Sequence, residues 1–307
     1  MALFVNTNVS SINGQRNLTN ATNNLNTTYQ RLSSGLRINS AKDDAAGLQI
    51  SDRLTSQING LNQGNRNTND GIALAQTAEG AMDEMTTMLQ RIRTLAVQAS
   101  NGTNNAKDRQ AIQQEVTQLS QEITRIACQT KFGGEQVLAK GDVGKLITST
   151  GEVTIQVGAY NGDTLKMKFY SNGFALSAIA SNAGLTDIKG ANDANTSTNG
   201  VINDGGYRFT VTAQTLAALS ISSVDTLLGV LDAQRAHLGA MQNRMESSIR
   251  NQSNVSMNVS DARARIRDTD FAEESAKLSQ QTIIQQAASS MLTQANSRPQ
   301  LALSLLG

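Results

Sequence analysis

The residues that could do chemistry are few, and their spacing does not assemble a catalytic site. His237 is the only histidine, whereas a zinc site needs several converging ligands and the HExxH motif needs two histidines. Asp43 and Asp44 could be imagined as paired carboxylates, but adjacent residues of a helix do not face each other. The dipeptide Gly133-Gly134 is not followed by the Gly-Lys-Ser/Thr of a phosphate-binding loop. We therefore predict no catalytic, cofactor-binding or metal-binding residue, and the sequence disfavours an enzyme.

The composition supports the same interpretation. Aromatic residues make up 3% of the 307 residues and tryptophan is absent, which is unusual for an enzyme whose pocket depends on aromatic anchors. The net charge is +1 and no basic block stands out, so nucleic acid is disfavoured as a partner. We expect no membrane span and find no cleaved signal peptide, and these signals alone indicate a cytoplasmic protein.

Two isolated residues have ordinary structural interpretations. Cys128 is the only cysteine, so an internal disulfide is excluded, and its position beside Ile126 near a helix end predicts a small buried thiol. His237 lies beside the apolar Leu238 in a long helical pattern, which predicts a partly exposed helix residue.

The residues named above lie in or beside long helical patterns, each with a narrow stripe of apolar residues, called a seam here. Their apolar positions alternate steps of three and four residues, the 3.5-residue period of a coiled coil. A stripe this narrow is not stable in water, so we predict a mainly α fold in which helices from both chain ends pack as a long antiparallel bundle. The seam residues are Met82, Met85, Leu89, Ile92 and Ala96; Ile112, Val116, Leu119, Ile123 and Ile126; and Val224, Leu227, Leu231, Gln234, Leu238, Met241, Met245, Ser248, Gln252, Val255, Val259, Ala262 and Ile266.

A β-rich stretch interrupts the helical pattern. Residues 153–157 and 165–169 alternate apolar and polar side chains, and Asn161-Gly162 between them is a strong hairpin signal. A second alternation covers residues 207–211. The intervening residues 175–204 are rich in Asn, Ser, Thr and Gly, which predicts an exposed surface region.

The helix boundaries follow from local signals. Ser40 followed by Asp43 resembles a capping box, so we expect helices at 41–66 and 70–100, separated by a polar segment at 64–70. A further helix is expected at about 105–128, and Pro299 should kink or interrupt the last helix. Residues 1–38 and 271–307 are polar enough to predict disorder in isolation.

Several runs of residues resemble bacterial flagellin. Residues 32–47, LSSGLRINSAKDDAAG, resemble the N-terminal signature of that family, and residues 89–98, LQRIRTLAVQ, look like its second helix. Residues 238–244, LGAMQNR, the QQA at 285–287 and the LSLL at 303–306 complete the match. The resemblance covers roughly residues 1–170 and 222–307, and the short middle implies that large outer domains are missing.

The resemblance implies a domain organisation and a structural function. An inner filament-core domain would comprise residues 1–45 and 268–307, and a rod-like helical domain with a β-hairpin would comprise 46–170 and 216–267. Residues 171–215 would form a short variable surface region. The implied function is a subunit that self-assembles into the helical flagellar filament used for swimming, with termini that become helical on assembly.

The resemblance also implies partners and a location. Family members leave the cell unfolded through the flagellar type III apparatus without a cleaved signal peptide, which overrides the cytoplasmic interpretation and places the protein outside the cell. A flagellar export chaperone, hook-associated proteins and cap proteins are the implied partners beside further copies of the chain.

We expect the chain ends to carry the assembly contacts. Ordering each residue costs ~1–2 kcal/mol, which two thin helices cannot offset alone, whereas a ring of neighbouring copies can. Residues 33–44 should join the inner and outer domains, through Gly35, Leu36, Arg37, Asn39 and Asp43. The predicted assembly core consists of Leu18, Leu25, Leu32, Ile283, Ile284, Met291, Leu303, Leu305 and Leu306.

A second role follows from the family alone. Flagellins resemble one another as ligands of the innate immune Toll-like receptor for flagellin, and the matching positions are Gln90, Arg91, Leu95 and Glu115. Thr94 stands where many recognised flagellins carry an acidic residue. We favour packing between subunits as the primary role of these positions.

A hook–filament junction protein is the alternative function, because it shares similar terminal helices. Long filaments assembled from purified protein would decide against it.

Overall fold

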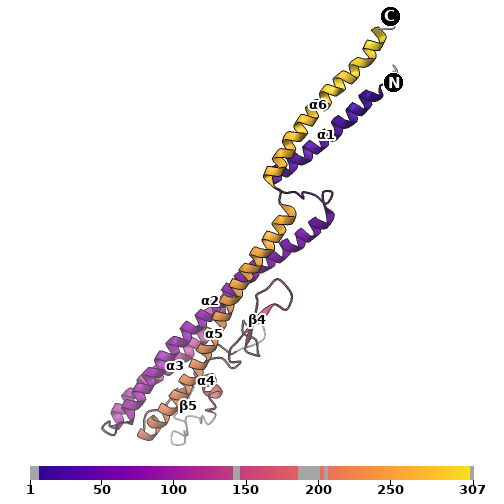
Figure 1. Cartoon of the computed structure of the whole chain (residues 1–307). Helices are drawn as coiled ribbons and strands as arrows, with labels where there is room; N and C mark the ends of the chain where they lie inside the picture. The colour runs from indigo at the N-terminus through magenta and orange to yellow at the C-terminus, as the bar shows by residue number, and fades with distance from the viewer. Residues whose placement is uncertain (1–6, 141–145, 186–200, 204–206, 305–307) are drawn as a thin grey trace. The chain divides into compact units, whose positions relative to one another are not determined.

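A computed structural model describes residues 7–140, 146–185, 201–203 and 207–304, with the backbone alone at 201–203, 207 and 298–304. The described part is mainly helical with small antiparallel strand pairs, as the sequence predicts (Figure 1). The elements are α1 (Val9–Ser34), α2 (Ala45–Ser100), α3 (Ala106–Gln129), β1 (Lys131–Phe132), β2 (Glu135–Gln136), β3 (Glu152–Gln156), β4 (Thr164–Lys168), α4 (Leu176–Asn182), β5 (Val201–Asn203), β6 (Tyr207–Phe209), α5 (Gln214–Arg267) and α6 (Phe271–Ser304).

The elements form two compact units. The terminal unit comprises residues 1–59 and 255–307, and the central unit comprises residues 60–254. The division falls within the two longest helices, α2 and α5.

The predicted seams form the core of the central unit. All five seam residues between Met82 and Ala96 of α2 are buried, and the seam of α5 is buried from Val224 to Met245. Up to Met245 both pack into one apolar cluster with residues of α3, which confirms the prediction that these stripes need partner helices. Beyond it the predicted α5 seam is not core, because Val255, Val259 and Ile266 are half-buried and Ala262 is exposed. The polar seam residue Gln234 donates its Nε2 to the carbonyl oxygen of Lys168 at 2.7 Å, which satisfies a buried amide.

The predicted hairpin is confirmed. Strands β3 and β4 pair antiparallel with Val153 opposite Met167 and Ile155 opposite Leu165. Gly162 supplies the positive φ of 96° that the connecting turn requires. The inward side chains of the hairpin join the core of the central unit.

The predicted break between residues 64 and 70 is wrong, because α2 is one continuous helix. The glycines of this stretch make room for the hairpin instead of ending the helix. A Cβ on Gly64 would lie 2.0 Å from the carbonyl oxygen of Val157, and one on Gly71 would lie 2.4 Å from Cδ1 of Ile155. Glycine therefore lets a strand approach the helix backbone closely.

The start of α2 also differs from the prediction. Ser40 and Asp43 belong to a turn before the helix, in which Asp43 accepts hydrogen bonds from the backbone N–H and the hydroxyl of Ser40. Asp44 caps α2 from the position before its first residue, because its Oδ1 accepts a hydrogen bond from the backbone N–H of Gly47 at 2.9 Å. Asp43 therefore stabilises the turn, and Asp44 caps the helix.

Two predictions of burial are wrong. Cys128 is exposed, because Ile123 and Ala127 occupy the buried face of α3 and Cys128 follows one position later. Part of the expected surface region is core: Leu176, Ile179 and Ala180 of α4 are fully buried. Their spacing of three and four residues was hidden by the polar composition around them.

One helix reaches the length and composition of a membrane span, contrary to the prediction. An 18-residue window of α5 has a mean hydropathy of 1.5. Core helices of soluble proteins reach such values as well, and here Val224, Leu227 and Leu231 are buried in the central unit.

The terminal unit contains the helix pair α1 and α6, which lie side by side (Figure 1). They approach closely at Gly14, where a Cβ would lie 3.2 Å from Cδ1 of Leu292. Helix α6 runs through Pro299 to Ser304, so the predicted interruption is wrong. His237, in α5 of the central unit, is half-buried as predicted.

Candidate assembly surface

One stripe of α1 packs within the terminal unit. Leu25 is buried, as are Ala21 and Thr28, and Leu18 and Leu32 are half-buried. These positions lie at steps of three and four residues from Gly14, which contacts Leu292 of α6. The predicted core residues of α1 therefore already have a partner within the chain.

The predicted core residues of α6 remain in solvent. Ile283 is 65% exposed, Met291 is 64% exposed and Ile284 is 41% exposed. Large apolar side chains of α1 are exposed as well, at Val9 and Ile12. An apolar surface of this kind marks a site of protein–protein contact.

A groove of about 990 Å³ is lined by residues of both α1 and α6. Ser10, Asn13 and Asn17 line it from α1, and Ile284 and Met291 line it from α6. Its lining combines apolar and polar side chains, a composition that suits contact with a helix of another molecule. Of the remaining predicted core residues, Leu303 is described in its backbone only, and Leu305 and Leu306 lie outside the described residues.

Residues 35–38 are tied to the segment between α5 and α6. The N–H of Arg37 donates to the carbonyl oxygen of Arg267 at 2.7 Å, and the N–H of Thr269 donates to that of Gly35 at 2.9 Å. The guanidinium of Arg37 adds a bond of 2.7 Å to the carbonyl oxygen of Ile266. Gly35 caps α1 with a φ of 71°, a conformation that favours glycine. Leu36 pairs with Asp268 in an antiparallel bridge, so Gly35, Leu36 and Arg37 together join the end of α1 to the end of α5.

Asn39 and Asp43 close the neighbouring turn. Asn39 donates its Nδ2 to the hydroxyl of Ser34 at 2.8 Å, and its backbone N–H donates to Asp43 Oδ2 at 3.1 Å. The backbone N–H of Ser40 is the largest cause that lowers the pKa of Asp43, and the Ser40 hydroxyl adds to it. The carboxylate therefore stays charged and holds the turn at neutral pH.

The four predicted receptor positions divide into exposed and buried residues. Arg91 and Glu115 form an exposed ion pair of 2.8 Å between α2 and α3, and Gln90 is exposed nearby. Leu95 is only 3% exposed and belongs to the core of the central unit. The structure therefore does not present Leu95 to a partner, because its helix face is turned inwards.

The side chain of Gln113 has a role that the sequence did not indicate. Its Nε2 donates to the carbonyl oxygen of Phe209 at 2.8 Å, and its Oε1 accepts from the backbone N–H of Val211 at 2.7 Å. One side-chain amide of α3 thus pairs with a backbone oxygen and a backbone nitrogen at the end of β6. A lone glutamine in a polar helix face carries no sequence signal for this role.

A cluster at the start of α1 was also missed. Asn8 caps α1 by accepting from the N–H of Ser11, and its Nδ2 donates to the carbonyl oxygen of Ala295 at 2.8 Å. Ser11 donates its hydroxyl to Asn296 Oδ1 at 2.6 Å. An Asn before an apolar-periodic run is a helix-start signal, and it could have indicated the cap.

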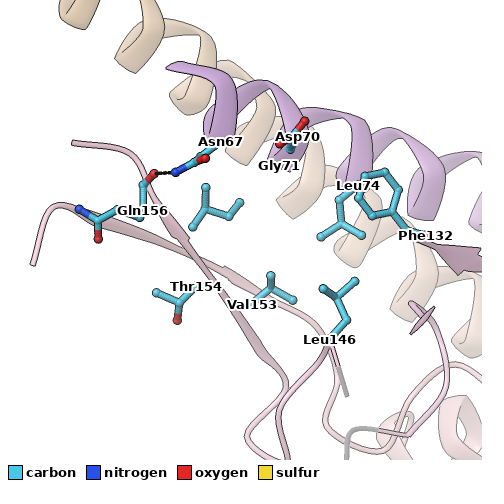
Figure 2. Close-up of a pocket in the computed structure, with 10 residues that line it drawn as sticks. Asn67, Asp70, Gly71, Leu74, Phe132, Leu146, Val153, Thr154 and Gln156 are labelled. Carbon is cyan, nitrogen blue, oxygen red and sulfur yellow. Dashed lines mark hydrogen bonds between the residues drawn. The ribbon is translucent and has the colours of Figure 1, made fainter. Parts of the chain in front are cut away.

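A smaller pocket of about 290 Å³ lies between α2 and β3 in the central unit. Figure 2 shows Asn67 donating to the backbone oxygen of Gln156, a bond of 3.0 Å, above apolar side chains that include Leu74 and Val153. Among its lining residues that the structure describes, Asp70 is the only ionisable group. Among the residues that the structure describes, no three His, Cys, Asp or Glu side chains lie together as a metal site would require.

Comparison with known families assigns both ends of the chain. Residues 5–142 match the family model described as the bacterial flagellin N-terminal helical region. Residues 221–306 match the bacterial flagellin C-terminal helical region.

Relatives that match over their whole length are also named flagellins. Flagellin A of Vibrio cholerae is 38% identical over 386 aligned positions, and Flagellin A of Vibrio anguillarum is 40% identical over 379, with all of both chains covered in each case. These alignments are longer than the 307 residues of this chain, so the relatives contain positions with no counterpart here.

A solved structure supports the fold alone. The putative flagellar hook-associated protein from Vibrio parahaemolyticus superposes with a TM-score of 0.55 at 14% identity, covering 74% of this chain and 100% of that one.

Proposed function

The chain belongs to the bacterial flagellin family, whose members are structural subunits of the flagellar filament, and we propose that the ends of the chain, α1 and α6, order fully only when neighbouring copies cover them. The function itself follows from full-length relatives named flagellin. The coupling of folding to assembly is our proposal.

The observation that carries this proposal is the exposed apolar surface of the terminal unit. Burial of apolar surface contributes about 25 cal/mol per Å², and Ile283 and Met291 leave most of that contribution unused in a single copy. Covering them with neighbouring helices supplies the free energy that offsets the ordering of two long segments.

The geometry of the groove favours a head-to-tail contact. Ile284 and Met291 line the groove, whereas the exposed Val9, Ile12 and Ile283 lie outside its lining, so one copy would offer a groove and the next copy a different apolar surface. Contacts between two different surfaces do not close on themselves and generate a helical filament. The inner domain of residues 1–45 and 268–307 would then provide the central contacts, with Gly35–Asp43 as its joint to the rod-like domain.

Hydrogen exchange on soluble and polymerised protein tests the proposal. In the soluble subunit the amides of α1 and α6 should exchange rapidly, whereas those of α3 should be protected by the buried core. Polymerisation should slow exchange in α1 and α6 and leave α3 unchanged. Firm protection of both ends in the soluble subunit would overturn the coupling.

The hook–filament junction protein is less well supported. The likeness to a hook-associated protein is at 14% identity and concerns the fold, whereas relatives named flagellin match over the whole chain at 37–40% identity. Long filaments grown from purified protein, observed by electron microscopy, would exclude the junction role; short adaptors only would favour it.

The cellular setting extends the proposal. Export through the flagellar type III apparatus would place the protein outside the cell, with a chaperone that covers α6 before assembly and with cap and hook-associated proteins at the filament ends. The single cysteine and single proline support such a route, because few covalent constraints then slow unfolding and refolding.

Recognition by the Toll-like receptor for flagellin is a second proposed role. The exposed Gln90, Arg91 and Glu115 support it, while Leu95 would act only as their packing support. In a reporter-cell assay, Arg91→Ala should lower signalling by soluble protein. Unchanged signalling would remove the assignment.

A further inference from the structure

The interior of helix α6 contains one carbonyl group that lacks a backbone donor one turn later. Pro299 is the only proline of the chain and lies inside the helix, five residues before its end at Ser304. Proline has no backbone N–H, so the carbonyl oxygen of Ala295, four residues earlier, lacks its intrahelical donor. The other interior carbonyls of α6 face an N–H one turn later.

The side chain of Asn8 occupies this unsatisfied position. Its Nδ2 donates to the Ala295 oxygen at 2.8 Å, while its Oδ1 accepts from the N–H of Ser11 at 3.1 Å. One amide therefore caps α1 and completes α6 at the same time. The bond of 2.6 Å between Ser11 and Asn296 lies directly beside it.

We propose that Asn8 sets the axial register of α1 against α6 by recognising the carbonyl that Pro299 leaves free. A slip by one helical turn moves Asn8 by about 5.4 Å. The amide would then face a carbonyl that already has a donor, and the Ala295 oxygen would lose its partner. Leaving a half-buried acceptor without its protein partner costs free energy, so one register is favoured.

The register matters because it shapes the groove between the helices. Ala295, Gln294 and Ser297 line its end beside this bond, and Asn13 and Asn17 line it from α1. This inference rests on the proposed function, in which a neighbouring copy fills that groove. Asn8 is thus a positioning residue for assembly.

Asn8→Ser tests the proposal, since serine caps helices as well as asparagine does but cannot reach both partners. In polymerised protein, we expect amide exchange in residues 288–298 to become roughly fivefold faster, the loss of one hydrogen bond. In a Pro299→Ala background the backbone supplies its own donor, and Asn8→Ser should change exchange less than twofold. Asn20→Ser, at an exposed position of α1, should change it less than twofold in both backgrounds.

Equal acceleration in both backgrounds, or an effect no larger than that of Asn20→Ser, would overturn the proposal. If Asn8→Ser does not polymerise, recovery by Pro299→Ala supports it and continued failure overturns it. Rapid exchange of α6 in wild-type polymers would overturn the proposed function as well. Slow exchange there with no response to Asn8→Ser would overturn the role of Asn8 alone.

Discussion

The central and terminal units use the same helical pattern with opposite results. In the central unit, residues of α2, α3, α4, α5 and the β3–β4 hairpin share one apolar core, and Met85, Leu89 and Leu231 have no exposed surface. In the terminal unit, the pair α1 and α6 buries one stripe of α1 and leaves Ile283, Ile284 and Met291 of α6 exposed. The same helical pattern is therefore buried where several elements pack together and stays partly exposed where only two helices meet.

Removing the ends should give the largest effect. A chain lacking about thirty residues at either end should remain folded, because the core of the central unit is untouched, but should lose polymerisation entirely. Circular dichroism and analytical ultracentrifugation measure the two properties. Normal filaments from the truncated chain would contradict the division of roles.

A core substitution in the central unit should act on the single subunit. Leu89→Ala should lower the free energy of unfolding by about 2–5 kcal/mol, because it leaves a cavity among fully buried neighbours. Urea denaturation of the soluble protein measures it. Val97→Ala, at an exposed position of the same helix, is the control and should change stability by about 0.5 kcal/mol or less.

A substitution on α6 should act on the polymer instead. Ile283→Ser should raise the critical concentration for polymerisation about tenfold, since ~1.4 kcal/mol of lost burial is a factor of ten. The stability of the soluble subunit should not change. Gln286→Ser, one turn away and exposed, should have little effect; a large loss of subunit stability in Ile283→Ser would show that the residue is already buried.

Two glycines of α2 should respond with opposite signs. Gly64→Ala should destabilise the central unit by about 1–3 kcal/mol, because the new methyl group would meet the backbone of Val157. Gly80→Ala has open space around it and should stabilise the helix by about 0.5–1 kcal/mol. Thermal unfolding compares the two variants, and equal effects would show that the hairpin does not press on α2.

The smallest effect concerns acidity in the terminal unit. The folded-state pKa of Asp43 is lowered from 3.8, so its contribution is complete above that value and is lost as the pH falls through the lower folded pKa. In protein polymerised at neutral pH, the amide signals of Asn39 and Ser40 should shift only below pH 3.8. NMR of these amides measures it, and Asp43→Asn should abolish the transition.

The sequence predicted the part of the fold that depends on periodicity. The seams of α2, α3 and α5 and the hairpin at Asn161-Gly162 lie where the spacing of apolar residues placed them. The errors occur where one residue type has two physical uses. Gly64 and Gly71 admit a strand rather than end a helix, and Pro299 leaves α6 continuous while Asn8 bonds to the carbonyl it frees.

The candidate site was predictable in its location but not in its contacts. Apolar residues at both ends indicated an assembly surface, yet periodicity could not tell that Leu25 packs within the chain while Ile283 remains exposed. That difference depends on which face α6 turns to α1. Side-chain amides such as Gln113 form bonds between segments about a hundred residues apart, which local patterns do not encode.

The amide of Gln113 also limits which backbone groups of the chain are open to another strand. A strand with free backbone groups is a template on which another chain can add in register and aggregate. By bonding to the oxygen of Phe209 and the nitrogen of Val211, the side chain occupies the positions that an incoming strand would use. Helix α3 thereby covers two backbone groups that would otherwise be open to pairing with another strand.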